Sequence, residues 1–143
     1  MERKNIENTT VHVITSLSSY IMTIRDELSI PYDLSPIQSR IIFDLNAHPS
    51  SKITDVCKRL SKSTNSISPL IKRLENKGFI ERKRSKNDAR ITYVSLTQKS
   101  LDFINDLDND IRDYTEPMFK KLNDEELNKT LDCLIRLREV IKE

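Results

Sequence analysis

Residues Ile53–Thr97 read ITDVCKRLSKSTNSISPLIKRLENKGFIERKRSKNDARITYVSLT, and this stretch decides the fold of the chain. It contains two short amphipathic helical patterns, separated by a Ser/Lys turn at residues 60–63. Two strand patterns rich in Phe, Ile, Tyr and Val follow, joined by a basic loop. The change of apolar spacing from three or four residues to short β-prone runs predicts helix, turn, helix and β-hairpin in that order.

The second helical pattern, expected from Thr64 to Lys77, has an inner apolar face and an outer polar face. The inner positions are Ile67, Leu70/Ile71 and Leu74. Short Ser and Asn side chains on the outer face suit entry into a DNA major groove, and Lys and Arg suit the flanking phosphates. An ordinary solvent-exposed helix face is the alternative interpretation. The candidate DNA-binding residues of this segment are Ser63, Thr64, Asn65, Ser66, Ser68, Pro69, Lys72 and Arg73.

The helix caps follow from residue types. Thr54 is the expected N-cap of the first helix, and Ser63 is the expected N-cap of the second. Pro69 lies inside the second helix and lacks the amide that would donate to the carbonyl of Asn65, so we expect a local kink or loosening there. Gly78 follows the last apolar turn and fits a left-handed C-cap.

The hairpin is expected to pair residues 79–83 with residues 91–96. Such a basic tip suits a phosphate backbone or a narrow minor groove. Asp88 is expected to fix the turn, by accepting hydrogen bonds from backbone amides or by pairing with a neighbouring guanidinium, and so to hold Arg90 in position. Five basic residues fall within nine positions: Arg82, Lys83, Arg84, Lys86 and Arg90.

Charge is segregated along the chain. Residues 52–99 hold thirteen Lys/Arg against four acidic residues, whereas the remainder holds eleven basic and eighteen acidic residues. This pattern is expected when one lobe approaches a polyanion and the other does not. A basic face alone is often only solvated surface, but here it coincides with a helix-turn-helix pattern. Together these features are typical of a winged helix-turn-helix that binds duplex DNA.

The flanking sequence is helical in pattern, so the expected fold class is mainly α with a small β-hairpin wing. A single Gly in 143 residues favours long helices. Residues 50–53 are expected to add a minimal strand to the hairpin, and Pro117 is expected to kink or break the helix that contains it. The helices are expected at about residues 5–29, 35–48, 98–122 and 124–141.

The first and last helices carry broad apolar stripes, which a monomer would leave exposed. We therefore expect a homodimer, with residues 1–33 and 98–143 as dimerisation helices and residues 34–97 as the DNA-binding lobe of one domain, 1–143. Packing of these helices within one chain is the alternative.

Residue inventory argues against an enzyme or a metal protein. The chain has two His, no Cys-x-x-Cys, no His-Glu-x-x-His and no Gly-rich phosphate loop, so no catalytic residue, metal site or cofactor is expected. Neither a signal core nor a membrane-length apolar run is present, so we expect no membrane association and a cytoplasmic location. Cys57 and Cys133 are expected to be packing residues, although a thiol switch at Cys133 is an alternative.

Four short motifs stand in the order and spacing of the MarR family of bacterial transcriptional regulators, which the chain therefore resembles over nearly its whole length. They are Leu34-Ser35-Pro36-Ile37-Gln38, Leu74-Glu75-Asn76-Lys77-Gly78-Phe79-Ile80, Asp88-Ala89-Arg90 and Leu96-Thr97. The resemblance implies a homodimer that binds a palindromic operator in double-stranded DNA, with the helix after Ser63 in the major groove and Arg90 in the minor groove.

The resemblance also implies repression relieved by a small-molecule effector in a cleft beside the DNA-binding lobe. Candidate lining residues are His12, Tyr20, Arg40 and Phe43, which core or dimer packing explains equally well. The Ser68-Pro69-Leu70 element is similar to the peroxide-sensing branch, but no Cys precedes Cys57, which weakens a thiol-based redox alternative. A winged-helix protein-interaction module is the remaining alternative, and its binding would show little salt dependence.

Overall fold

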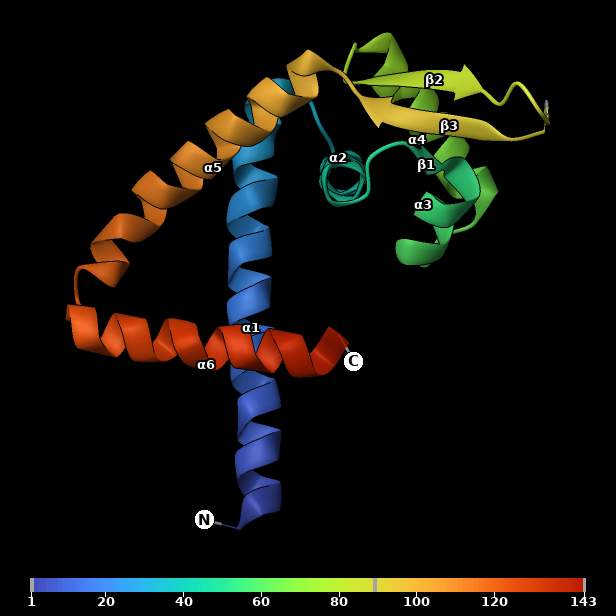
Figure 1. Cartoon of the computed structure of the whole chain (residues 1–143). Coiled ribbons are helices and arrows are strands. Elements are labelled where there is room, and N and C mark those ends of the chain that lie inside the picture. The colour runs from blue at the N-terminus through green and yellow to red at the C-terminus, as the bar shows by residue number, and fades with distance from the viewer. Residues whose placement is uncertain (1, 89, 143) are drawn as a thin grey trace. The chain divides into compact units, whose positions relative to one another are not determined.

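The computed structural model describes residues 2–88 and 90–142, and the chain divides into two compact units, at residues 1–108 and 109–143. The predicted fold class, mainly helical with a small β-hairpin wing, is confirmed (Figure 1). The elements are α1 (Arg3–Ser29), the 3₁₀ helix η1 (Ile30–Tyr32), α2 (Pro36–Ala47), β1 (Ser51–Lys52), α3 (Ile53–Arg59), α4 (Thr64–Asn76), β2 (Ile80–Arg84), β3 (Thr92–Leu96), α5 (Gln98–Phe119) and α6 (Asp124–Lys142).

The three strands form one antiparallel sheet in the order β1-β3-β2. Strand β2 pairs with β3 from Ile80↔Leu96 to Arg84↔Thr92, and β1 pairs with β3 through Ser51↔Val94. The minimal strand predicted at residues 50–53 is therefore confirmed, and it lies directly before α3. It ties the helical part of the lobe to the wing.

Helix ends in the first unit follow local chemistry. Ser35 caps α2 in a capping box, in which the Ser35 amide donates to Oε1 of Gln38 over 3.0 Å and the Gln38 amide donates to Oγ of Ser35. Gly78 has a φ of 78°, and the amide of Phe79 donates to the Leu74 carbonyl over 2.9 Å. The predicted left-handed C-cap of α4 is confirmed, and it turns the chain from α4 into β2.

Two local expectations are wrong. The N-cap of α3 is Lys52, without a side-chain hydrogen bond, and Thr54 lies inside the helix. Strand β1 runs directly into α3 at Ile53, so the helix begins before Thr54. Helix α5 continues through Pro117 to Phe119, so the predicted break at Pro117 is wrong, whereas the alternative of a kink stays a prediction.

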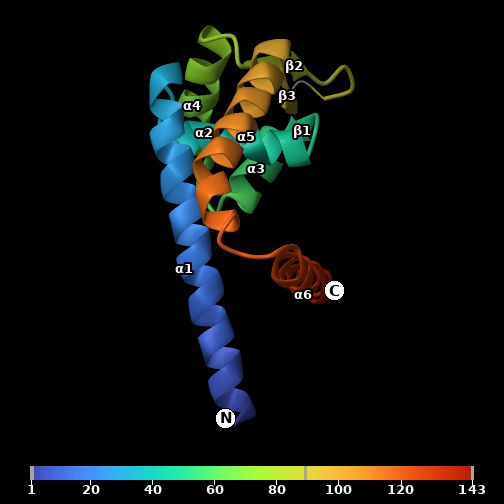
Figure 2. The same cartoon turned by 90° about the vertical axis from the view of Figure 1, so that its left-hand side faces the viewer.

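The core of the first unit lies among α2, α3, α4, the sheet and the start of α5. Helix α2 contacts both α1 and α3 (Figures 1 and 2). Phe103 of α5 lies at the centre of an aromatic cluster, with ring centroids 4.8 Å from Tyr32, 5.9 Å from Phe79 and 6.3 Å from Phe43. Fully buried aliphatic residues complete the core: Ile41, Ile42, Val56, Ile67, Ile71, Leu74, Val94 and Leu107.

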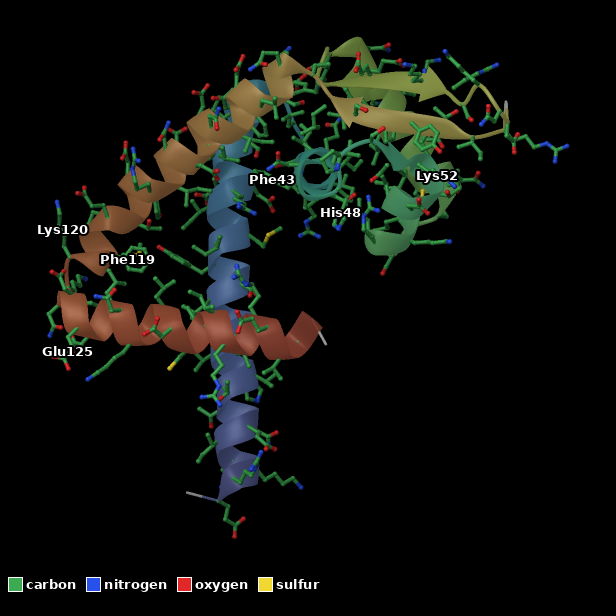
Figure 3. The ribbon with its side chains drawn as sticks, in the orientation of Figure 1. Phe43, His48, Lys52, Phe119, Lys120 and Glu125 are labelled. Atoms are coloured by element: carbon green, nitrogen blue, oxygen red, sulfur yellow. The ribbon has the colours of Figure 1, made fainter. Side chains whose placement is uncertain are left out.

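The second unit contains the end of α5 and helix α6. Asn123 caps α6: its amide donates to Oε2 of Glu126 over 2.9 Å, and the Glu126 amide donates to Oδ1 of Asn123 over 3.0 Å. Figure 3 marks Phe119, Lys120 and Glu125 around the connection between the two helices. Within residues 2–88 and 90–142, no helix is long and apolar enough to cross a membrane.

Candidate nucleic-acid interface

The turn between α3 and α4 sets the direction of the exposed helix. Ser61 adopts a left-handed φ of 53°, and the Lys62 amide donates to the Cys57 carbonyl over 2.9 Å, which closes the end of α3. Ser63 then caps α4: its Oγ accepts from the Ser66 amide over 3.3 Å and lies 2.8 Å from Oγ of Ser66. The predicted N-cap at Ser63 is confirmed.

Helix α4 is divided sharply between its two faces. Ile67, Ile71 and Leu74 are fully buried, as their spacing predicts. Ser68, one of the candidate contact residues, is half-buried, and the others are exposed: Ser63, Thr64, Asn65, Ser66, Pro69, Lys72 and Arg73. The helix continues through Pro69, whose ring faces solvent. A polar surface of short side chains, flanked by two cations, is thus available for a groove.

The wing is stabilised by hydrogen bonds within its tip. Oδ1 of Asp88 accepts from the Arg90 amide over 2.9 Å, and this is one of the two contacts that the sequence predicts for Asp88. Oγ of Ser85 accepts from the Asn87 amide over 3.2 Å, and the Ser85 amide donates to the Ile91 carbonyl over 2.9 Å. These bonds restrict the backbone that carries three exposed cations: Arg84, Lys86 and Arg90.

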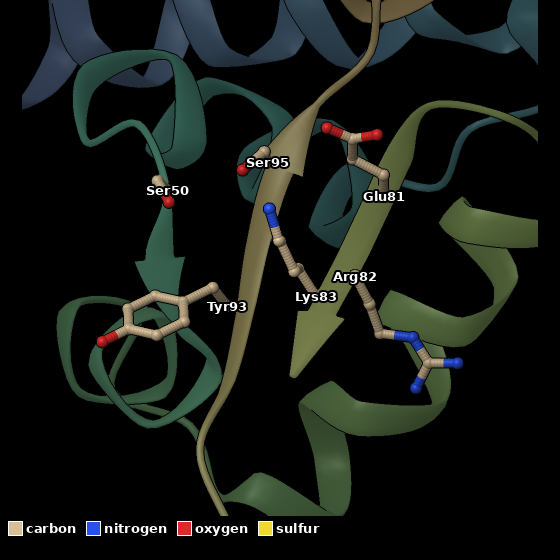
Figure 4. Close-up of a pocket in the computed structure, with 6 residues that line it drawn as sticks. All are labelled: Ser50, Glu81, Arg82, Lys83, Tyr93 and Ser95. Carbon is tan, nitrogen blue, oxygen red and sulfur yellow. The ribbon is translucent and has the colours of Figure 1, made fainter. Parts of the chain in front are cut away.

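Arg82, a further candidate DNA contact, is exposed and forms an ion pair with another residue of the lobe. Its Nε lies 2.7 Å and its Nη2 lies 2.5 Å from Oε2 of Glu75 on α4. Figure 4 shows Arg82 directed toward the helices beside β2, whereas Lys83 is directed toward Ser95 of β3. A two-bond ion pair therefore links β2 to α4. Sequence separation alone does not reveal this pair, because it depends on the corner at Gly78.

Lys77 forms a second link, from the end of α4 to the segment before α2. Its Nζ lies 2.7 Å from Oδ2 of Asp33 and also contacts the Asp33 backbone carbonyl. The hydrogen bond and the charge of Lys77 hold the pKa of Asp33 below its ordinary value. Lys99 of α5 donates to the Lys77 carbonyl over 2.7 Å, with its Nζ 4.5 Å from the centroid of the Phe79 ring.

Arg59 forms a third link, which the sequence did not predict. Its Nε and Nη2 bind the two carboxylate oxygens of Asp44 over 2.8 and 2.6 Å, and Nη2 also donates to Oγ of Ser51 over 2.8 Å. The hydrogen bond with Asp44 raises the pKa of Arg59 further above its usual value. Arg59 is one of the thirteen cations of the basic segment, but its guanidinium is paired with a carboxylate of the same lobe.

The four candidate effector residues lie on two helices, α1 and α2. Phe43, labelled in Figure 3, is half-buried, with the guanidinium carbon of Arg25 4.3 Å from its ring centroid. His12, Tyr20 and Arg40 are exposed. His12 and Tyr20 are eight residues apart on one helix, or roughly 12 Å along its axis. None of the four lines the hollow of about 400 Å³ formed by residues that include Asp33, Arg73 and Lys77.

The geometry therefore combines a capped, exposed helix with a basic hairpin on one small lobe. Residues 20–107, more than half of the chain, match the family described as "Transcriptional regulator SarA/Rot". The chain belongs to the SarA/Rot family of transcriptional regulators. Because this SarA/Rot chain is a member of a regulator family, the expectation that it is not an enzyme is confirmed.

Known proteins support the same fold for this SarA/Rot chain. An uncharacterized HTH-type transcriptional regulator of Bacillus subtilis, YwhA, is 25% identical over 124 residues, covering 85% of this chain and 89% of the relative. The crystal structure of apo MarR from E. coli superimposes with a TM-score of 0.76 at 20% identity, covering 88% of this chain and 93% of that one. The predicted MarR-type winged-helix fold is confirmed.

A third similar structure is a mutant of MepR from S. aureus, which is bound to an oligodeoxyribonucleotide. It superimposes on this SarA/Rot chain with a TM-score of 0.67 at 19% identity, covering 92% of this chain and 97% of that one. The family match and the shared fold together show that the chain is a transcriptional regulator with a winged-helix DNA-binding fold.

Proposed function

We propose that this protein is a homodimeric, sequence-specific repressor of a palindromic DNA operator. In this proposal α4 enters the major groove and supplies sequence preference through Asn65 and Ser66. The wing follows the backbone and places Arg90 in the adjacent minor groove. The observation that carries the proposal is the exposed polar face of α4 beside the hydrogen-bonded basic wing.

Roles for the remaining candidate residues follow from their positions. Lys72 and Arg73 lie at the exposed side of α4, where cations suit the flanking phosphates. Ser63 and Thr64 lie at the start of α4, and Ser68 and Pro69 lie in its second turn. Arg84 and Lys86 add charge along the wing, and Asp88 stabilises its tip. The charge of Arg82 is offset by its pairing with Glu75, so its proposed role is to hold the wing against α4.

A second copy of the chain is the proposed cover for the apolar faces of the flanking helices. Leu17 of α1 is 53% exposed, and Leu131 of α6 is also 53% exposed. Large apolar side chains exposed in series along one helix are typical of an interface with another chain. Further such residues lie on α6: Leu127, Leu134, Ile135, Val140 and Ile141. A twofold dimer would present two copies of α4, which fits a palindromic site.

Release by a small-molecule effector completes the proposal. Phe43 lies between α1 and the aromatic cluster around Phe103, so a ligand that displaced it would act on the packing of the lobe. His12, Tyr20 and Arg40 are the other proposed contacts, and they are accessible to solvent.

The test compares variants on two duplexes, one selected by the wild-type protein from random sequences and one unselected. Arg90→Ala is expected to weaken binding to both duplexes and to reduce the slope of log K against log salt by about 0.9 for each phosphate that is no longer neutralised. Asn65→Ala is expected to weaken binding to the selected duplex alone, by roughly 1–3 kcal/mol. An equal decrease in affinity for both duplexes from both variants would contradict the assigned roles of α4 and the wing.

A further inference from the structure

The contacts of Arg59 join three elements of the DNA-binding lobe. Arg59 is the last residue of α3, Asp44 lies near the end of α2, and Ser51 is the first residue of β1. The guanidinium binds both oxygens of Asp44 and the hydroxyl of Ser51 at the same time, over 2.6 to 2.8 Å. A planar guanidinium that meets a carboxylate through two parallel bonds fixes orientation as well as distance.

The pair is shielded from water on the side of the carboxylate. The Asp44 side chain is 8% exposed and the Arg59 side chain is 28% exposed. Oγ of Ser51 also donates to the His48 carbonyl over 2.7 Å, and Ser51 is buried at 9% exposure. The ion pair is therefore partly shielded from solvent, and salt screens it less than an ion pair on an open surface.

Strand β1 connects this pair to the wing. Ser51 pairs with Val94 of β3, and Val94 is fully buried in the core. Helix α3 follows β1 directly and has no side-chain cap hydrogen bond at its N-terminus. Arg59 contacts Asp44 and Ser51 from the C-terminal end of α3, four residues before Ser63, the N-cap of α4.

We propose that Arg59 is a positioning residue for DNA recognition, which through Asp44 and Ser51 fixes the orientation of α3 and α4 relative to the wing. It does not bind phosphate. The proposal rests on the proposed DNA-binding function of α4 and the wing. By charge alone, Arg59 would favour DNA binding and Asp44 would oppose it. In this proposal both residues instead act together to hold the lobe in its binding geometry.

The direction in which one substitution changes DNA affinity distinguishes a positioning role from a purely electrostatic one. Asp44→Asn removes a negative charge from the lobe and frees the Arg59 guanidinium, so electrostatics alone predicts tighter binding to DNA. Loss of positioning predicts the opposite for a specific site, because α4 and the wing would no longer fit both grooves at once. Binding to an unselected duplex, which depends mainly on charge, would be unchanged or tighter.

The experiment measures affinity of the full chain for the selected and the unselected duplex over a series of salt concentrations. For Asp44→Asn and Arg59→Gln we expect the preference for the selected duplex to fall roughly tenfold. Arg59→Lys keeps the charge and part of the bonding, so it should recover part of this preference. Lys58→Gln, which removes an exposed cation from the same helix, is the matched control. It should change the affinity for the two duplexes by the same factor.

A preference for the selected duplex that is unchanged in Asp44→Asn, or lower affinity of Arg59→Gln for both duplexes with a reduced salt slope, would overturn the proposal. Amide hydrogen exchange at Ser51 and Val94 provides a second measurement that needs no DNA. Faster exchange in Asp44→Asn than in Lys58→Gln supports the link, and equal exchange overturns it. If the wild-type protein bound neither duplex, the proposed function would fail, and the exchange measurement would still decide the link.

Discussion

Gly78 offers a quantitative test of how α4 is joined to the wing. Its φ of 78° lies in the left-handed region, which costs an L-residue with a side chain about 1–2 kcal/mol. A Cβ added there would lie 3.8 Å from Cδ of Lys99, which is an ordinary contact, so no overpacking cost is added. Ala also restricts the unfolded chain, which offsets about 0.4–1 kcal/mol.

Gly78→Ala is therefore expected to lower the free energy of unfolding by about 0.8 kcal/mol, the difference between the middle values of the two terms, and to lower Tm by roughly 2–4 °C for each kcal/mol. Urea and thermal denaturation at one protein concentration measure both quantities. Ser61, with a φ of 53°, provides the reciprocal control, in which glycine replaces a residue that has a side chain. Ser61→Gly relieves the same backbone strain, so it should leave the free energy of unfolding unchanged or raise it slightly. If Gly78→Ala were neutral and Ser61→Gly destabilising by more than about 1 kcal/mol, the backbone explanation would be refuted.

Three further predictions concern the cap of α4, the pH dependence of stability and the dimer. Ser63→Ala should cost about 1 kcal/mol in urea denaturation, and Ser63→Asp should restore stability while weakening DNA binding; an unchanged stability of Ser63→Ala would show that the hydroxyl does not cap α4. Lys77 lowers the pKa of Asp33 in the folded state from its ordinary value of 3.8. The stability that this ion pair contributes to the fold is therefore fully present above pH 3.8 and is lost as the pH falls through the lowered pKa. Asp33→Asn should thus destabilise the protein at pH 7, and the difference in stability should shrink as the pH falls below 3.8; a difference between wild type and variant in urea melts that did not change with pH would count against the pair. Leu131→Glu should shift the protein from dimer to monomer in sedimentation equilibrium, with α-helical circular dichroism retained; an unchanged dimer would place the interface elsewhere.

Local features of the fold were predictable from the sequence because their causes lie within a few residues. Ser35, Ser63 and Gly78 mark helix ends through their own side chains or through the lack of one. The buried positions of α4 follow from apolar spacing. Thr54 was assigned wrongly as a cap, because pairing of β1 with β3 starts α3 earlier than the residue types indicate.

Contacts between distant residues were not predictable in the same way. Asp44 and Arg59 are fifteen residues apart, and Asp33 and Lys77 are forty-four residues apart. Charge counts placed Arg59, Lys77 and Arg82 in the basic segment but could not show that each has an acidic partner within the lobe. A charge inventory identifies the segment that approaches DNA, and only the folded lobe separates its DNA contacts from its internal links.

Selection from random duplexes by the purified full-length protein tests the central claim most directly. The proposed twofold dimer predicts enrichment of one palindrome, whose half-sites lie about one helical turn, or roughly 10 base pairs, apart. Enrichment of an asymmetric site, or no enrichment at low salt, would contradict the account.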